Sequence, residues 1–159
     1  CKELAPILTS IGNWGMRWAR NNLSKTDYDV QLLMLYLERS LEPDQLPGSQ
    51  TVLHFHFSDL EEAPDWWIVI IDDQIDVCTI DPGKDIDVYF STTVKTMTDV
   101  WMNQITYKAA MRNSQLIVTG PQTLTKNIGS WMQNCVFTDY RSPVKFWRFL
   151  APFYNAGLI

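Results

Sequence analysis

The stretch from Asp85 to Gly120 constrains the fold more than any other part of the sequence, because it encodes strand, helix, short helix and strand without a break. Its first residues alternate between polar and apolar side chains, which predicts a strand with one buried face. Ile86, Val88 and Phe90 share the apolar face of that strand. We therefore expect it to lie in a sheet that is covered on one side.

A helical pattern follows this strand directly. Hydroxyl side chains at residues 91–93 can begin a helix, and an apolar stripe then recurs at three- and four-residue spacing, formed by Val94, Met97, Trp101 and Ile105. Thr106 is expected to cap a second, short helix over residues 107–111, before the β-rich run 116–119. Two helices between two strands of one sheet are expected to enclose apolar volume against it, where a ligand can bind.

Three further strands are predicted upstream. Residues 51–57 alternate, with Leu53, Phe55 and Phe57 on one face and His54 and His56 on the other. Residues 66–71 are all apolar, which predicts a strand in the middle of the sheet that is buried on both faces. A turn at residues 72–73 leads into a third strand over residues 74–80.

Helices are predicted on either side of these strands. Residues 30–41 carry the apolar stripe Leu33, Leu37 and Leu41 and follow Thr26-x-x-Asp29, a weak capping box. A last helix is expected over residues 122–133. The amino-terminal region has another amphipathic pattern, formed by Leu4, Ile7, Leu8, Ile11, Trp14 and Trp18. Such a helix is stable only if this stripe packs, against a second copy or against its own domain.

Composition limits the class of protein. The chain of 159 residues is 46% hydrophobic and 19% charged, which predicts a globular domain without a membrane-spanning run or a signal peptide. The three cysteines form no C-x-x-C pair, so a reducing cytoplasm is expected rather than a disulfide scaffold or a zinc ribbon.

Charge is distributed unevenly. Residues 51–91 hold ten acidic residues and one basic residue, whereas residues 92–159 hold two acidic and seven basic residues. The acidic strands repel phosphate, so neither nucleic-acid binding by this chain alone nor stable membrane association is expected.

The sequence lacks the motifs of catalysis and metal binding. His54 and His56 can share a metal, but no third ligand has a fitting spacing, so we interpret them as ordinary half-exposed strand residues. The aspartates within residues 72–87 fit no EF-hand loop and fall on turns and polar strand faces. Nucleophile-elbow, P-loop, dinucleotide-binding and zincin motifs are absent. We expect no enzymatic activity, no cofactor and no metal.

The order of strand, Trp-bearing helix, short helix, L-x-V-x-G strand and helix resembles the sterol-carrier-protein-like domain, which encloses a tunnel for hydrophobic ligands. Finer matches resemble the variant of that domain fused to bacterial HxlR-type winged-helix regulators; they are residues 65–70, 76–78, 81–83, 85–88 and 97–102. Residues 3–23 resemble the helix that follows the DNA-binding domain in those regulators. The resemblance implies an α+β fold with about five mainly antiparallel strands covered by helices, preceded by a helical segment.

The resemblance also implies a division of the chain. Residues 1–49 are expected to be a helical segment from the end of a truncated winged-helix and dimerisation region, closed by a connector over residues 42–50; residues 50–135 are expected to be a ligand-binding domain, and residues 136–159 an aromatic tail. The tail has basic residues among many aromatic ones, and we interpret it as packing on the core or on a partner chain rather than on a membrane or nucleic acid.

By this resemblance, the chain is the ligand-sensing and dimerisation module of an HxlR-type transcription regulator. It is expected to form a homodimer through its amino-terminal stripe and to contact DNA only through a winged-helix domain absent from this chain. A hydrophobic small molecule or lipid is expected between sheet and helices. The expected lining residues are Phe55, Trp67, Val69, Val88, Phe90, Met97, Trp101, Met111 and Leu124. Each can equally be plain core. A lipid carrier and a purely structural dimerisation domain remain the alternatives.

Overall fold

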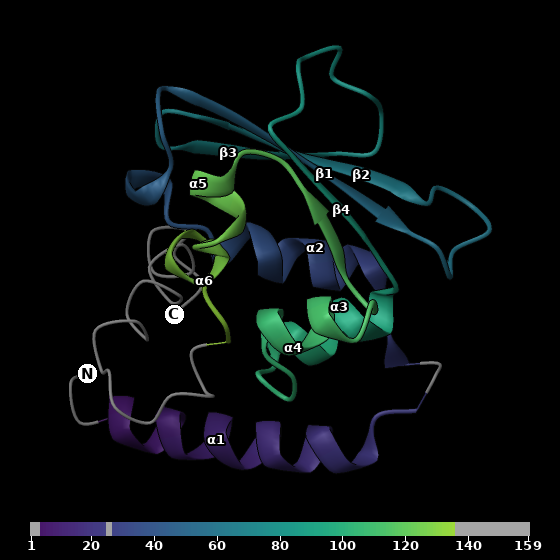
Figure 1. Ribbon diagram of the computed structural model, residues 1–159. Helices are drawn as coiled ribbons and strands as arrows, with labels where there is room; N and C mark the ends of the chain where they lie inside the picture. Colours follow the sequence, from purple (N-terminus) through teal and green to yellow (C-terminus); the bar gives the residue numbers. More distant parts are fainter. Residues whose placement is uncertain (1–3, 25–26, 136–159) are drawn as a thin grey trace.

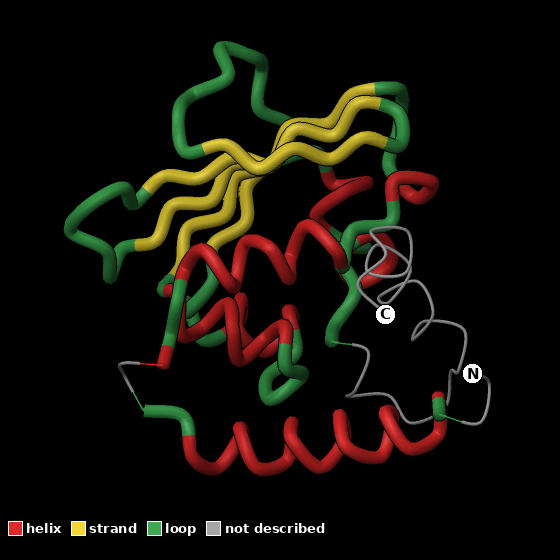
Figure 2. The backbone as a smooth tube through the Cα atoms, turned by 180° about the vertical axis from the view of Figure 1, so that it is seen from behind, coloured by secondary structure: helices red, strands yellow, loops and turns green. Residues whose placement is uncertain are grey.

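The computed structural model describes residues 4–24 and 27–135, without the side chains of residues 17–21. The elements form three layers, in which a sheet lies above a set of helices and the long first helix runs along the far side of that set (Figure 1). The helices of the middle and outer layers are α1 (Ala5–Asn22), α2 (Val30–Arg39), α3 (Val94–Trp101) and α4 (Tyr107–Arg112). The view from behind shows the same separation of α1 from the sheet (Figure 2).

The sheet is mixed and has five strands in the order β3-β2-β1-β4-β5. Its strands are β1 (Gln50–Phe57), β2 (Asp65–Ile71), β3 (Gln74–Cys78), β4 (Val88–Thr92) and β5 (Ile117–Thr119). β1 and β4 are parallel, and the other neighbouring pairs are antiparallel. The predicted fold class, α+β with a mainly antiparallel five-stranded sheet covered by helices, is confirmed.

The core lies between one face of the sheet and the helices. Phe55 of β1 stacks on Phe90 of β4 at 4.6 Å between ring centroids, and Trp131 meets Phe90 edge-on at 6.3 Å. Leu33 and Leu37 of α2 are buried in the same cluster, as the apolar stripe predicted. The periodicity of β1 and α2 therefore assigned the correct faces to the core.

Side-chain caps fix the helix starts. Thr106 accepts a hydrogen bond from the Ala109 amide at 3.2 Å, which confirms it as the cap of α4. α2 begins at Val30, as predicted, and its cap is Asp29, which accepts a hydrogen bond from the Leu32 amide at 2.9 Å. Thr26, the first residue of the predicted capping box, lies outside the described residues.

α2 and β3 each end two residues before the predicted boundary, and two further differences from the prediction have side-chain causes. β4 begins at Val88 rather than Asp85, because the Asp87 carboxylate accepts the Val52 amide hydrogen bond at 2.8 Å that a strand carbonyl would otherwise take. The last predicted helix is divided into α5 (Gln122–Thr125) and α6 (Ile128–Trp131). The indole N–H of Trp131 donates to the Leu124 carbonyl at 3.1 Å, so a tertiary contact uses an acceptor that a continuous helix needs.

Strand β2 is less buried than a continuous apolar run predicts. It lies second from the edge of the sheet, beside the central strand β1. Ile68, Val69 and Ile70 are buried, but Ile71 is 41% exposed and Trp67 is half-buried. Since helices cover only one face of the sheet (Figure 2), the other face is shielded only in part.

Two shorter segments complete the described part of the chain. The predicted connector after α2 contains a 3-10 turn, η2 (Pro43–Gln45). Gly120 closes β5, where an added Cβ would lie 2.5 Å from the Asp87 carbonyl oxygen. Within the described residues, no helix combines the length and the apolar character needed to cross a bilayer.

Candidate ligand-binding cavity

A cavity of about 290 Å³ lies where the end of α1 meets α2 and α3. Met16 and Leu23 line it from α1 and the segment after it, and Leu33 lines it from α2. The lining is predominantly apolar and its volume lies just below the usual range for small-molecule sites, about 300–1,000 Å³. The cavity is therefore suited to a small apolar molecule.

An aromatic stack forms one wall of this cavity. The rings of Tyr36 and Trp101 are stacked at 4.6 Å between centroids, with planes only 2° apart. The Trp101 indole donates to the Ser40 hydroxyl at 2.9 Å, and that hydroxyl donates to the Tyr36 carbonyl at 2.8 Å. Burial, with a smaller contribution from the nearby Cys135 thiol, raises the pKa of Tyr36, so this wall stays neutral. The stack is a fixed apolar surface.

The cavity meets solvent beside two carboxylates. Asp27 and Asp29 are both exposed and both line it. Asp27 accepts from the Ser24 hydroxyl and amide at 2.7 Å each, and these hydrogen bonds lower the pKa of the Asp27 carboxyl. Negative charge at this edge disfavours an anionic ligand and is compatible with a neutral one.

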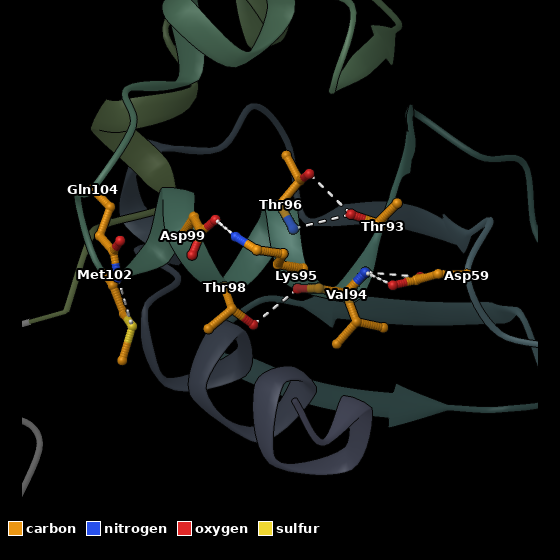
Figure 3. Close-up of polar contacts among 9 residues, drawn as sticks. All are labelled: Asp59, Thr93, Val94, Lys95, Thr96, Thr98, Asp99, Met102 and Gln104. Atoms are coloured by element: carbon orange, nitrogen blue, oxygen red, sulfur yellow. Dashed lines mark hydrogen bonds and ion pairs between the residues drawn. The ribbon is translucent and has the colours of Figure 1, made fainter. Parts of the chain in front are cut away.

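The start of α3 is held firmly, which fixes the cavity residues on this helix (Figure 3). Both carboxylate oxygens of Asp59 accept from the Val94 amide, at 2.9 and 3.1 Å. Thr93 accepts from the Thr96 amide at 3.0 Å, so two side chains cap one helix. Thr98, which lines the cavity, donates to the Val94 carbonyl at 2.9 Å.

Most of the predicted lining residues lie elsewhere. Phe55, Val88, Phe90, Met97 and Leu124 are buried in the packed core between sheet and helices. The cavity described above lies on the other side of the helix layer, and Trp101 is the predicted residue that lines it.

Three other predicted residues are placed away from this cavity. Trp67 and Val69 lie opposite His54 and Val52 in the register of β1 and β2, on the sheet face away from the helices. Met111 lines a separate groove beside α4. Tyr36 and Met16 also line the cavity and were not among the predicted residues, although Tyr36 lies directly beside Leu37 of the predicted α2 stripe, which could have indicated it.

The predicted dimer stripe is exposed on α1. Its described members Leu4, Ile7, Leu8, Ile11 and Trp14 are between 43% and 62% exposed. The Trp18 side chain lies outside the described residues, as does the aromatic tail of residues 136–159. Met16, by contrast, packs against the core, so α1 has one attached face and one open apolar face.

The two histidines form a polar cluster on the sheet face away from the helices. His54 Nε2 and His56 Nδ1 each lie 2.9 Å from the same Asp65 oxygen, Oδ1. Burial opposes ionisation of Asp65, but the hydrogen bonds from His56 and His54 outweigh it and lower the pKa of the carboxyl. In the part of the chain that the structure describes, no group of His, Cys, Asp and Glu side chains is arranged to hold a metal ion.

Comparison with known proteins shows likeness of structure and not of sequence. No family model and no curated protein matches the chain. A double mutant of the sec-alkyl sulfatase PisA1 superposes with a TM-score of 0.54 at 17% identity over 72% of this chain, which spans only 17% of that protein. At that identity the likeness establishes a shared fold for part of the sulfatase and nothing about activity.

Sterol carrier proteins also occur among the similar solved structures. The sterol carrier protein domain 2 of Helicoverpa armigera has a TM-score of 0.48 at 15% identity, over 63% of this chain and 81% of its own. The UbiJ-SCP2 ubiquinone synthesis protein has a TM-score of 0.47 at 21% identity, over 63% and 85%.

Proposed function

We propose that this chain is a non-enzymatic ligand-sensing and dimerisation module, which binds a neutral apolar small molecule in the cavity between α1, α2 and α3. The observation that supports this proposal most is the cavity itself, whose lining is predominantly apolar and comes both from the long first helix and from the body of the domain. Met16 packs against the core from α1, so a molecule beside it contacts both parts. The sequence pattern predicted a ligand between the sheet and the helices. The proposal places it instead in the cavity on the other side of the helix layer.

The proposed dimer uses the open face of α1. An exposed stripe of large apolar side chains is costly in water, and burial of each one contributes about 1.5–3 kcal/mol. A shallow groove of about 420 Å³, lined by Ile7, Ile11 and Trp14, runs along the same stripe. A second copy that packs its own α1 here buries both stripes at once, as an isologous interface does.

Coupling between ligand and dimer follows from this arrangement. A ligand shifts an equilibrium only if its affinity differs between two arrangements, and a cavity shared with α1 provides such a difference when the helix moves. In the proposed role within an HxlR-type regulator, α1 transmits this movement to a winged-helix domain that contacts DNA.

Binding is tested by native mass spectrometry of the chain as purified from cells. Leu32 is 45% exposed and lines the cavity, so the substitution Leu32→Trp is expected to fill it without disturbing the core. Leu35, on the same helix and 37% exposed, does not line the cavity and provides the matched control Leu35→Trp. We expect a bound apolar mass on wild type and on the Leu35 variant, and its loss from the Leu32 variant.

Regulation is tested by the operator affinity of the full-length protein with and without the extracted ligand. We expect affinities that differ with wild type and are equal with Leu32→Trp. Equal affinities with the wild-type protein contradict the sensing role. Ligand transfer between vesicles by a monomer supports the carrier, and an empty dimer supports the structural module.

A further inference from the structure

A second groove, distinct from the cavity above, lies between α4 and the α5–α6 segment. It has a volume of about 200 Å³. Tyr107, Met111 and Ile128 provide its apolar lining, and Lys108 and Lys126 stand exposed beside them. The volume is below that of a typical small-molecule site but is sufficient for one apolar side chain.

The surroundings of this groove are positively charged. Between Val94 and Cys135 the sequence contains one acidic residue, Asp99, and that residue forms an ion pair with Lys95. Lys108 and Lys126 make no ion pair with any residue in the described ranges 4–24 and 27–135. An apolar groove flanked by uncompensated cations favours an apolar group that is accompanied by negative charge.

The loop between β3 and β4 has the complementary properties. Ile80 is 79% exposed, the highest value among the large hydrophobic residues described. It precedes Asp81 directly, and Asp85 follows in the same loop; both acids are exposed. The loop projects from the sheet on the side away from the helices (Figure 1), so it does not reach the groove of its own chain.

We propose that the β3–β4 loop of one copy docks in the α4–α6 groove of a second copy, with Ile80 in the groove and the two loop acids beside Lys108 and Lys126. The two surfaces are different, so the contact is head-to-tail: the copy that contributes its loop retains a free groove, and the copy that contributes its groove retains a free loop. It is separate from the symmetric α1 dimer, because it uses none of the α1 stripe.

Magnitudes follow from the chemistry of the contact. Burial of one isoleucine contributes enough to change a dissociation constant by roughly tenfold or more. Each exposed ion pair contributes less, about two- to fivefold, and weakens as salt screens it. The association is therefore expected to be weak, dependent on Ile80 and reduced at high ionic strength.

The test uses sedimentation equilibrium of the full chain in a background that carries Ile11→Lys, which interrupts the α1 stripe. We expect reversible association of this background protein, weakened at least tenfold by Ile80→Ser and abolished by the double charge reversal Lys108→Glu with Lys126→Glu. Gly129→Leu provides an independent block of the groove, because a Cβ at Gly129 meets no atom within 4 Å. The matched control is Ile117→Ser, which removes an exposed apolar residue outside the loop and is expected to change nothing.

The decisive sample is an equimolar mixture of the Ile80→Ser protein and the doubly reversed protein. One partner retains only a groove and the other only a loop, so a head-to-tail contact produces a 1:1 complex that cannot grow. Association by each variant alone at the background level overturns the proposal, as does a mixture that stays monomeric. Circular dichroism establishes whether each variant is folded. If the protein with the two charge reversals does not fold, the Gly129→Leu protein replaces it as the partner with a blocked groove.

Discussion

The substitution Asp59→Ala tests how the cavity helix α3 is held. Asp59 lies in the loop after β1, and both its oxygens accept from the Val94 amide at the start of α3 (Figure 3). The loss of such a cap costs about 1 kcal/mol, and the interaction of the negative charge with the helix dipole adds about 0.3–1 kcal/mol. Thr93 still caps the helix through the Thr96 amide, so α3 is retained. We expect a total loss of about 1–2 kcal/mol.

Urea denaturation followed by tryptophan fluorescence measures this loss, and thermal unfolding is expected to shift by about 2–8 °C for a chain of this size. Asp59→Asn keeps an acceptor without the charge and is expected to lose about half as much. Asp73→Ala, an exposed aspartate in the β2–β3 turn, is the control and should stay within about 0.5 kcal/mol of wild type. If Asp59→Ala is as stable as this control, the loop does not anchor α3 and the reasoning fails.

Three further predictions concern other parts of the fold. Gly120→Ala should destabilise the chain by about 1–3 kcal/mol in the same denaturation assay, because its Cβ would lie 2.5 Å from the Asp87 carbonyl oxygen; wild-type stability would contradict this close approach. Tyr107→Phe should raise the free energy of unfolding by about 1 kcal/mol, since the Tyr107 hydroxyl is buried and has no hydrogen-bond partner among the described residues. A loss of stability would contradict this, because it would show that the hydroxyl makes a hydrogen bond. Because the pKa of Asp65 is lowered in the folded state, its ionised form stabilises the fold above about pH 4, and this contribution is lost as the pH falls through the folded pKa. Asp65→Asn should therefore reduce the loss of stability at acid pH in a series of urea denaturations at different pH values. An unchanged loss would show that the two histidine contacts do not cause it.

The strands and helices of the body were predictable because local periodicity records which face is buried. The alternation in β1 placed Phe55 in the core, and the stripe of α2 placed Leu33 there. The boundaries were less predictable. The Asp87 carboxylate shortens β4 and the Trp131 indole divides the last helix, and both do so through contacts with residues that local patterns cannot indicate.

The predicted lining residues and the candidate cavity lie in different parts of the domain, with Trp101 as the residue common to both. Apolar residues on the sheet and helices were interpreted as a tunnel lining, but Phe55 and Phe90 stack directly and leave no space between them. Whether an apolar residue lines a cavity or fills a core depends on the distances between whole helices and strands, and the periodicity of the sequence carries no information about those distances. Trp101 was named as a lining residue because it is a large aromatic on the apolar stripe, and in the structure it ends α3 and lines the cavity.

The sequence by itself determined the α+β class, the order of the elements and the apolar face of most of them, since each follows from the spacing of side chains along a few turns or one strand. Only the tertiary structure decided where a cavity remains, that Asp59 caps a helix 35 residues away, and that the β3–β4 loop projects away from the side of the sheet on which α4 lies (Figure 1). These features depend on distances between elements that are remote in sequence. Such distances are set by the packing of the whole domain rather than by any local pattern.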